Sequence, residues 1–186
     1  MRLTHRFLTV ALFTAVAAAS AAGALTTVLD PLVAELRIRE AGLVDATDAT
    51  SIRQLRAVRR SIDVIAASET LSGDARALAQ AAPLLVRTFP GEFAAPEFAA
   101  DLSDFVGDAY QRLSDEVFRR RDDLAARIEG LPAPTAARAR RWLDRADVLV
   151  WRPFRERSFR TQALAFARAA LVIERGMAAA EEDPIK

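Results

Sequence analysis

Residues 96–129 read PEFAADLSDFVGDAYQRLSDEVFRRRDDLAARIE, the longest stretch of the chain with a single helical period. Each residue of an α-helix advances by about 100° around the axis, which places the apolar side chains of this stretch on one side. These side chains are Phe98, Leu102, Phe105, Ala109, Leu113, Val117, Leu124 and Ile128. The spacing predicts a long amphipathic helix whose apolar face lies in a hydrophobic core.

A second face of the same predicted helix is acidic. A row of carboxylates is a candidate for calcium binding or for acid–base chemistry. A rigid helix rarely converges enough oxygen atoms on one ion, since calcium sites take alternating oxygens from a flexible, glycine-containing loop. We therefore expect this acidic stripe to be a solvated helix surface that binds neither metal nor cofactor. Its members are Glu97, Asp101, Asp104, Asp108 and Asp115.

Helix signals continue on both sides of this stretch. Asp30 and Pro31 are typical of a helix start, with the aspartate as N-cap and the proline at the first helical position. Other helices are predicted to begin near Thr50 or Ser51, at Ser72, near Thr135 and near Phe154. The first should end near Gly42 and the last at Gly176, because glycine is common at helix C-terminal caps. Pro83 should break or kink the third helix.

These signals together predict the fold class. No stretch after residue 30 shows the sustained alternation of β-branched residues that indicates a strand. Amphipathic helices joined by short turns of proline and glycine pack as antiparallel bundles. The sequence therefore predicts an all-α fold, an antiparallel bundle of about four to five amphipathic helices preceded by an N-terminal hydrophobic helix. The bundle domain is expected over residues 30–176, and residues 177–186 are expected to form a flexible C-terminal tail.

The N-terminal residues 1–29 have the features of an export segment. Two arginines precede residues 7–29, a stretch in which no side chain is charged. Small residues around Ala19 and Ala24 favour a cleaved signal peptide, whereas the uncharged stretch is also long enough to be a single transmembrane anchor. Both hypotheses stay open at this point. Both place the rest of the chain in the periplasm or on the periplasmic face of the inner membrane.

The composition excludes several classes of catalytic chemistry. The chain has no cysteine and no asparagine, its one histidine is His5, and its one lysine is Lys186. Thiol catalysis, zinc or haem sites and Ser-His-Asp chemistry therefore cannot be built within the body of the chain. A formal net charge of +1 gives no overall basic character of the kind that indicates nucleic-acid binding. We expect a protein that is not an enzyme, holds no cofactor and does not bind nucleic acid.

Residues 151–160 interleave aromatic side chains with arginines between two predicted helices. Both residue types are enriched in binding hot spots, and next to a bilayer arginines pair with phosphates while aromatic rings rest at the interface. The alternative is a structural corner with its rings in the core and its arginines outside. The candidates for a partner or membrane surface are Trp151, Arg152, Phe154, Arg155, Arg157, Phe159 and Arg160.

The leading functional hypothesis is a non-catalytic, exported helical protein that acts by protein–protein contact. An accessory or scaffold subunit of a bacterial cell-envelope membrane complex is one such protein. Other protein subunits are the expected partners, together with the membrane if the N-terminal segment is retained. One alternative is a periplasmic ligand-binding or sensory bundle that holds an apolar molecule between its helices. A second alternative is a carboxylate-dependent hydrolase, which needs two acids at a fixed separation in a cleft.

Overall fold

The computed structural model describes residues 27–89, 104–152 and 158–182, and all regular structure in these ranges is α-helical. The all-α class is therefore confirmed for the described ranges, which contain six helices where about four to five were expected. The predicted N-terminal hydrophobic helix and residues 96–103 of the predicted long helix lie outside these ranges. The helices are α2 (Asp30–Leu43), α3 (Ala49–Ala66), α4 (Leu71–Thr88), α5 (Asp104–Glu129), α6 (Ala133–Val150) and α7 (Phe159–Glu181).

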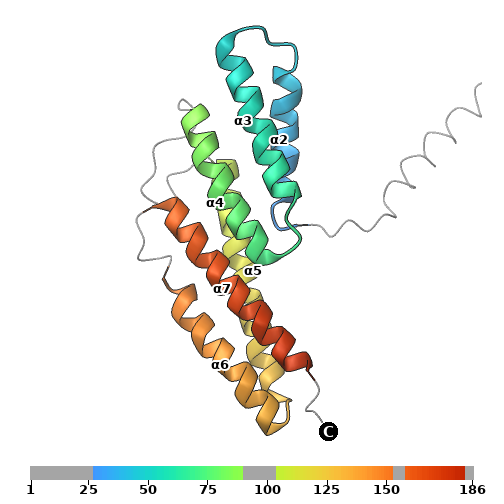
Figure 1. The fold of residues 1–186 in the computed structure, drawn as a ribbon, viewed down its shortest axis with the longest axis vertical. Coiled ribbons are helices and arrows are strands. Elements are labelled where there is room, and N and C mark those ends of the chain that lie inside the picture. The colour runs from blue at the N-terminus through green and yellow to red at the C-terminus, as the bar shows by residue number, and fades with distance from the viewer. Residues whose placement is uncertain (1–26, 90–103, 153–157, 183–186) are drawn as a thin grey trace, which may run out of the picture.

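The helices form an elongated bundle in which consecutive helices run antiparallel (Figure 1). The α2–α3 hairpin lies at one end and the α6–α7 hairpin at the other. The two hairpins are joined by α4, which packs against α3 on one side and against α7 on the other. The long helix α5 contacts α2, α4, α6 and α7, so it supports the bundle along much of its length.

Helices α4 and α7 pack closely because both bury many alanines. Small side chains let two helix axes approach each other, since the interaxial distance depends on the residues at the contact. Larger side chains fill the space around this contact, and Leu78, Leu85, Phe166 and Ile173 are all fully buried. The Ala-rich composition of the chain thus has a structural role at the centre of the bundle.

The predicted apolar face of the long helix is confirmed wherever the structure describes it. Leu113, Val117 and Leu124 of α5 have no exposed surface, and Ile128 is buried as well. The side chain of Phe105 lies outside the described residues, as do Phe98 and Leu102. The helical period therefore identified the core residues of this element correctly over its described length.

Two helices begin slightly before the predicted positions because a capping residue lies just upstream. The carboxylate of Asp48 accepts hydrogen bonds from backbone amides of the first turn of α3, including Ser51 N–H at 2.9 Å. The hydroxyl of Thr70 accepts from Gly73 N–H at 3.0 Å and caps α4, so Ser72 lies inside that helix. Both caps satisfy amides that have no partner within the helix.

Pro83 does not break α4, which continues to Thr88. The proline lacks an N–H group, so one bond of the helical ladder is lost at this point. Pro83 is exposed, and its ring therefore does not disturb the packed face of the helix. The contacts of α4 with α3, α5 and α7 hold the helix together across the missing bond.

Gly176 is not a helix cap, because α7 continues through it to Glu181. A Cβ atom at this position would lie 2.5 Å from Leu124 Cδ2, which is closer than Cβ atoms approach other atoms, and 3.1 Å from Trp142 Cβ, which is a tight contact. Glycine is therefore needed here for the packing of α7 against α5 and α6. Residues 177–181, expected to belong to a flexible tail, are helical, and Glu181 pairs with Arg127 of α5 at 2.9 Å.

The N-terminal boundary of the bundle lies earlier than residue 30. Leu29 is fully buried in the main core, and its position makes it the N-cap of α2, so the prediction that Asp30 is the N-cap is wrong by one residue. The backbone N–H of Val28 donates to Asp74 Oδ2 of α4 at 3.3 Å. Among the described helices, none has the length and apolar character needed to cross a membrane.

Candidate functional site

The aromatic residues predicted to form one surface at the 151–160 corner lie in different environments. Trp151 is 60% exposed, and its ring packs edge-on against Phe118 with centroids 5.6 Å apart. Phe159 is only 6% exposed and packs against Tyr110 with centroids 5.4 Å apart. Phe159 therefore belongs to the core, while Trp151 lies at the surface.

The predicted arginines of this corner also differ in what the structure shows. Arg152 and Arg160 are exposed. Phe154, Arg155 and Arg157 lie outside the described residues. Arg160 lies at the start of α7, where it reaches a hollow between α3 and α4 that is described below.

The described part of the acidic stripe lies on the surface of α5. Asp108 and Asp115 are exposed, and Asp115 Oδ1 accepts a hydrogen bond from Gln111 Nε2 at 2.7 Å. Glu97, Asp101 and the side chain of Asp104 lie outside the described residues. A search of the described residues finds no group of acids or histidine that could hold a metal ion.

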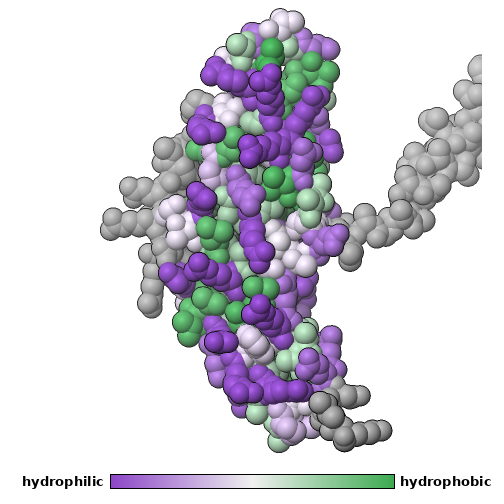
Figure 2. Space-filling model, in the orientation of Figure 1, coloured by the Kyte–Doolittle hydropathy of each residue, from purple (hydrophilic) through white to green (hydrophobic). Residues whose placement is uncertain are grey.

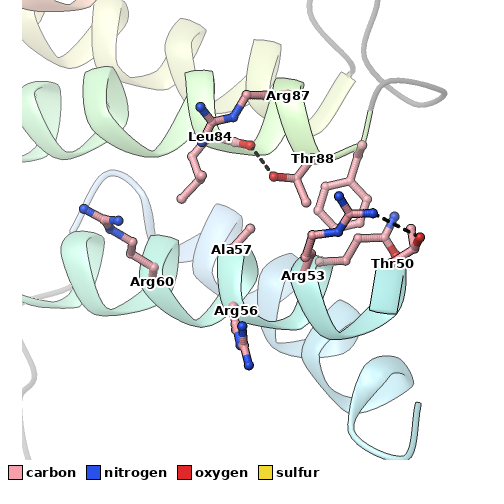
Figure 3. Close-up of a pocket in the computed structure, with 10 residues that line it drawn as sticks. Thr50, Arg53, Arg56, Ala57, Arg60, Leu84, Arg87 and Thr88 are labelled. Carbon is pink, nitrogen blue, oxygen red and sulfur yellow. Dashed lines mark hydrogen bonds between the residues drawn. The ribbon is translucent and has the colours of Figure 1, made fainter. Parts of the chain in front are cut away.

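An arginine-lined groove runs between α3 and α4 (Figure 3). We call this hollow of about 850 Å³ the arginine groove. Arg53, Arg56 and Arg60 of α3 and Arg87 of α4 line it. Figure 3 shows Arg53 and Arg60 on the side of α3 that faces α4, whereas Arg56 points away from α4. The apolar side chains that line it are Ala57, Leu84 and Phe89.

The arginine groove carries positive charge without a compensating acid. None of its described lining residues is acidic, and within the described part of the chain Arg60 and Arg87 form no ion pair. Arg53 is oriented along α3 by bonds from Nε to the Ala49 carbonyl at 3.3 Å and from Nη2 to Thr50 Oγ1 at 3.4 Å. The positive charges of the groove arginines repel each other, and a bound anion would reduce this repulsion. Such an anion would be attracted by several guanidinium groups at once.

Several arginines elsewhere on the bundle, unlike those of the groove, pair with acids on neighbouring helices. On α3, Arg59 Nε donates to Glu40 Oε1 of α2 at 2.8 Å. The bond from Arg59, with a second from Arg37, lowers the pKa of the Glu40 carboxyl. On α5, Arg121 Nε donates to Asp147 Oδ1 of α6 at 2.7 Å. These pairs tie helices together, whereas the groove arginines bind no acid of the described bundle.

A second hollow of about 460 Å³ extends the arginine groove toward α7. It shares Arg60, Leu84 and Arg87 with the first and adds Arg160. The structure thus brings one residue of the predicted corner to the end of a site that the corner prediction did not include. Ser61 also lines this hollow, and its hydroxyl is buried without a hydrogen-bond partner within the described residues.

The sequence pattern of residues 52–65 alone places Arg53, Arg56 and Arg60 on the outer face of a helix. That pattern contained the relevant signal, because α3 carries four arginines and a single acid, Asp63. It did not contain the position of α4, which places Arg87 and Leu84 opposite them. The site therefore depends on a contact between helices that the pattern of one helix does not define.

The surface around these sites is mainly hydrophilic, and Figure 2 shows its hydrophobic residues as separate patches on the visible face. Chemically, the arginine groove offers charge-assisted hydrogen-bond donors over an apolar floor, which suits an anionic ligand. Comparison with family models, with curated proteins and with solved structures gave no match. The functional conclusion therefore depends on the geometry of the site.

Proposed function

We propose that this chain is a non-catalytic helical protein that acts by contact with another protein, which it binds through the arginine groove. The observation that carries the proposal is the row of arginines from α3 and α4 that face one hollow and find no acid among the described residues lining it. Complementary charge across an interface guides encounter and suppresses wrong partners. Arginine is also enriched at the energetic centres of interfaces.

Two further parts of the proposal rest on the sequence. Residues 1–29 favour an exported protein, held at the periplasmic face of the membrane or released into the periplasm. An accessory or scaffold subunit of a cell-envelope complex fits both that location and a function based on contact. No described feature of the bundle favours the sensory alternative or the hydrolase alternative, and the described acids Asp108 and Asp115 lie exposed on the outside of α5.

The proposal is tested by comparing two charge-reversed variants in the native host. The groove variant carries Arg53→Glu, Arg60→Glu and Arg87→Glu, whereas the control carries Arg76→Glu, Arg140→Glu and Arg168→Glu at exposed positions outside the groove. After cross-linking and solubilisation of membranes, the proteins recovered with each variant are quantified by mass spectrometry. We expect a specific partner to be recovered with the wild type and the control and to be lost from the groove variant.

A thermal unfolding curve for each variant shows whether the bundle stays folded. Equal recovery of the same partners by the groove variant and the wild type would overturn the proposal. Recovery of the wild type alone, as a monomer, would overturn it as well. N-terminal sequencing of the protein from membrane and soluble fractions separates a retained anchor from a cleaved signal peptide.

A further inference from the structure

We infer that the arginine groove receives an acidic amphipathic helix of the partner protein, an inference that rests on the proposed function. The apolar stripe of that helix lies along the floor of the groove. Carboxylates on both flanks of the helix pair with the arginines of both walls. Three features of the groove lead to this assignment: the spread of its charges, its apolar floor and its continuation toward α7.

The groove arginines are spread along a line and do not converge on one point. Arg53 and Arg60 lie about 10 Å apart along α3, because a helix rises about 1.5 Å per residue. Arg87 faces them from α4, and Arg160 lies at the end of the second hollow. A single phosphate or carboxylate would meet only one or two of these groups. An extended ligand with several negative charges would meet all of them.

The floor of the groove is apolar, which distinguishes an amphipathic ligand from a simple polyanion. Ala57 and Leu84 lie between Arg60 and Arg53 (Figure 3), and Phe89 lines the same hollow. Ala57 is small, so it leaves room for side chains of a helix that seats from outside. Recognition of an amphipathic helix in a groove buries one apolar face of that helix and leaves the flanking charges at the rim. The arginine groove has this arrangement, with arginines at its rim and apolar side chains on its floor.

The two hollows are continuous through Arg60, Leu84 and Arg87, so the site extends past the first hollow toward the start of α7. On a bound partner helix, the residues that face the groove recur every three to four positions. A site of this length can therefore contact more than one turn of that helix. Charge complementarity then requires glutamate or aspartate on the flanks of the partner helix. A neutral or basic helix would leave the arginines buried without a partner, which is costly.

The test uses the full-length chain and a synthetic probe peptide of about five helical turns. The peptide carries leucines at helical spacing and glutamates on both flanks, and a scrambled peptide of the same composition serves as its control. Binding of fluorescently labelled peptide is measured by anisotropy. We expect the amphipathic peptide to bind at least about tenfold more tightly than the scrambled one, because only the former presents an apolar stripe.

A charge exchange tests the rim of the groove. The variant with Arg53→Glu, Arg60→Glu and Arg87→Glu should weaken binding of the glutamate peptide by about tenfold or more. The same variant should gain affinity for a peptide in which lysines replace the glutamates. The control with Arg76→Glu, Arg140→Glu and Arg168→Glu should change neither result. Circular dichroism verifies that each variant keeps its helical content.

A polar substitution tests the floor. Leu84→Gln should weaken binding of the amphipathic peptide several-fold and leave the affinity for tripolyphosphate unchanged. The matched control is Leu164→Gln, since Leu164 lies on α7, is 38% exposed and does not line the groove. An unchanged affinity of the Leu84→Gln variant for the peptide would contradict the assignment of the floor.

Other occupants give different results. Equal binding of the scrambled peptide or of tripolyphosphate would show a general anion site and overturn the inference. Tighter groove-dependent binding to phosphatidylglycerol vesicles would show a lipid surface and overturn it too. If the peptide does not bind while the groove variant still loses its cellular partner, only the helical form of the occupant is wrong and the proposed function stands. If the peptide does not bind and the groove variant also keeps its cellular partner, the inference and the proposed function are both wrong.

Discussion

At the scale of single residues, Gly176 and Gly42 offer a matched pair. Added methyl groups in a packed core cost about 1–3 kcal/mol, which outweighs the gain of up to about 1 kcal/mol from replacing a helical glycine by alanine. Gly176→Ala should therefore lower the free energy of unfolding by roughly 1–2 kcal/mol, because Leu124 and Trp142 occupy the required space. Gly42 lies inside α2 with no atom within 4 Å of a new Cβ. Gly42→Ala should raise the free energy of unfolding by about 0.5–1 kcal/mol. Urea denaturation measures both variants. A higher free energy of unfolding in both would contradict the packing at Gly176.

Tyr110 is the only tyrosine of the chain, so its titration can be followed without a second phenol. Its hydroxyl donates to Gln162 Oε1 at 2.8 Å, and burial raises its pKa from 10.0 to about 12. In the unfolded chain the proton leaves first, so the free energy of unfolding should fall as the pH rises from about 10 to 12. Near-ultraviolet absorbance of the phenolate should rise near pH 12, and a midpoint at 10 in the folded protein would contradict the burial.

At the scale of helices, the sequence predicted what depends on one helix alone. The period of α5 placed Leu113 and Leu124 in the core, since the face of a helix follows from residue spacing. Helix ends were less predictable, because Gly176 serves the packing of α7 and Asp48 caps α3 from upstream. A local pattern does not show whether a glycine ends a helix or fits beneath a neighbouring one.

The candidate site was predictable only in part for the same reason. Arg160 was identified from its aromatic neighbours, yet the residues it approaches are Arg60 and Arg87 on other helices. Trp151 and Phe159 are close in sequence, but one is exposed and the other is buried. Contacts between distant segments decide both outcomes. The arginines of α3 become a site only when α4 supplies the opposite wall.

The start of α4 joins three segments and should make stability depend on pH. Asp74 is 3% exposed and accepts from Ser68 Oγ at 2.7 Å and from Val28 N–H. Burial raises the pKa of this carboxyl, and the bond from Ser68 opposes the rise. A raised pKa in the folded state means that the stability contribution is present at low pH and is lost as the pH rises through that pKa. Asp74→Asn should therefore gain free energy of unfolding relative to the wild type as the pH rises above 3.8, the ordinary pKa of an aspartate. Denaturation midpoints of the two proteins that stay parallel as the pH rises would contradict the assignment.

At the scale of the whole molecule, the two ends of the bundle have different roles. The α6–α7 hairpin is tied to α5 by ion pairs and by a second small core around Leu124 and Ile128. The opposite half carries the arginine groove, whose arginines pair with no acid among the described residues, and also the junction with the N-terminal segment at Val28. The proposed export segment and the proposed docking site would thus meet the bundle in the same half, which is the half that we expect to face the rest of a membrane complex.

The position at which the N-terminal segment is cut should affect the stability of the entire bundle. Leu29 has no exposed surface and packs into the main core, so a chain cut after Ala24 keeps this residue and a chain cut after Leu29 loses it. Loss of a buried leucine costs about 2–5 kcal/mol. We expect a protein that starts at Leu25 to unfold at the same urea concentration as the full-length chain, and one that starts at Asp30 to unfold at a clearly lower concentration. Leu29→Ala in the full-length chain should reproduce the loss without removing any residue. Equal stability of both shortened chains would show that the bundle is independent of Leu29, and processing could then occur at any point before Asp30.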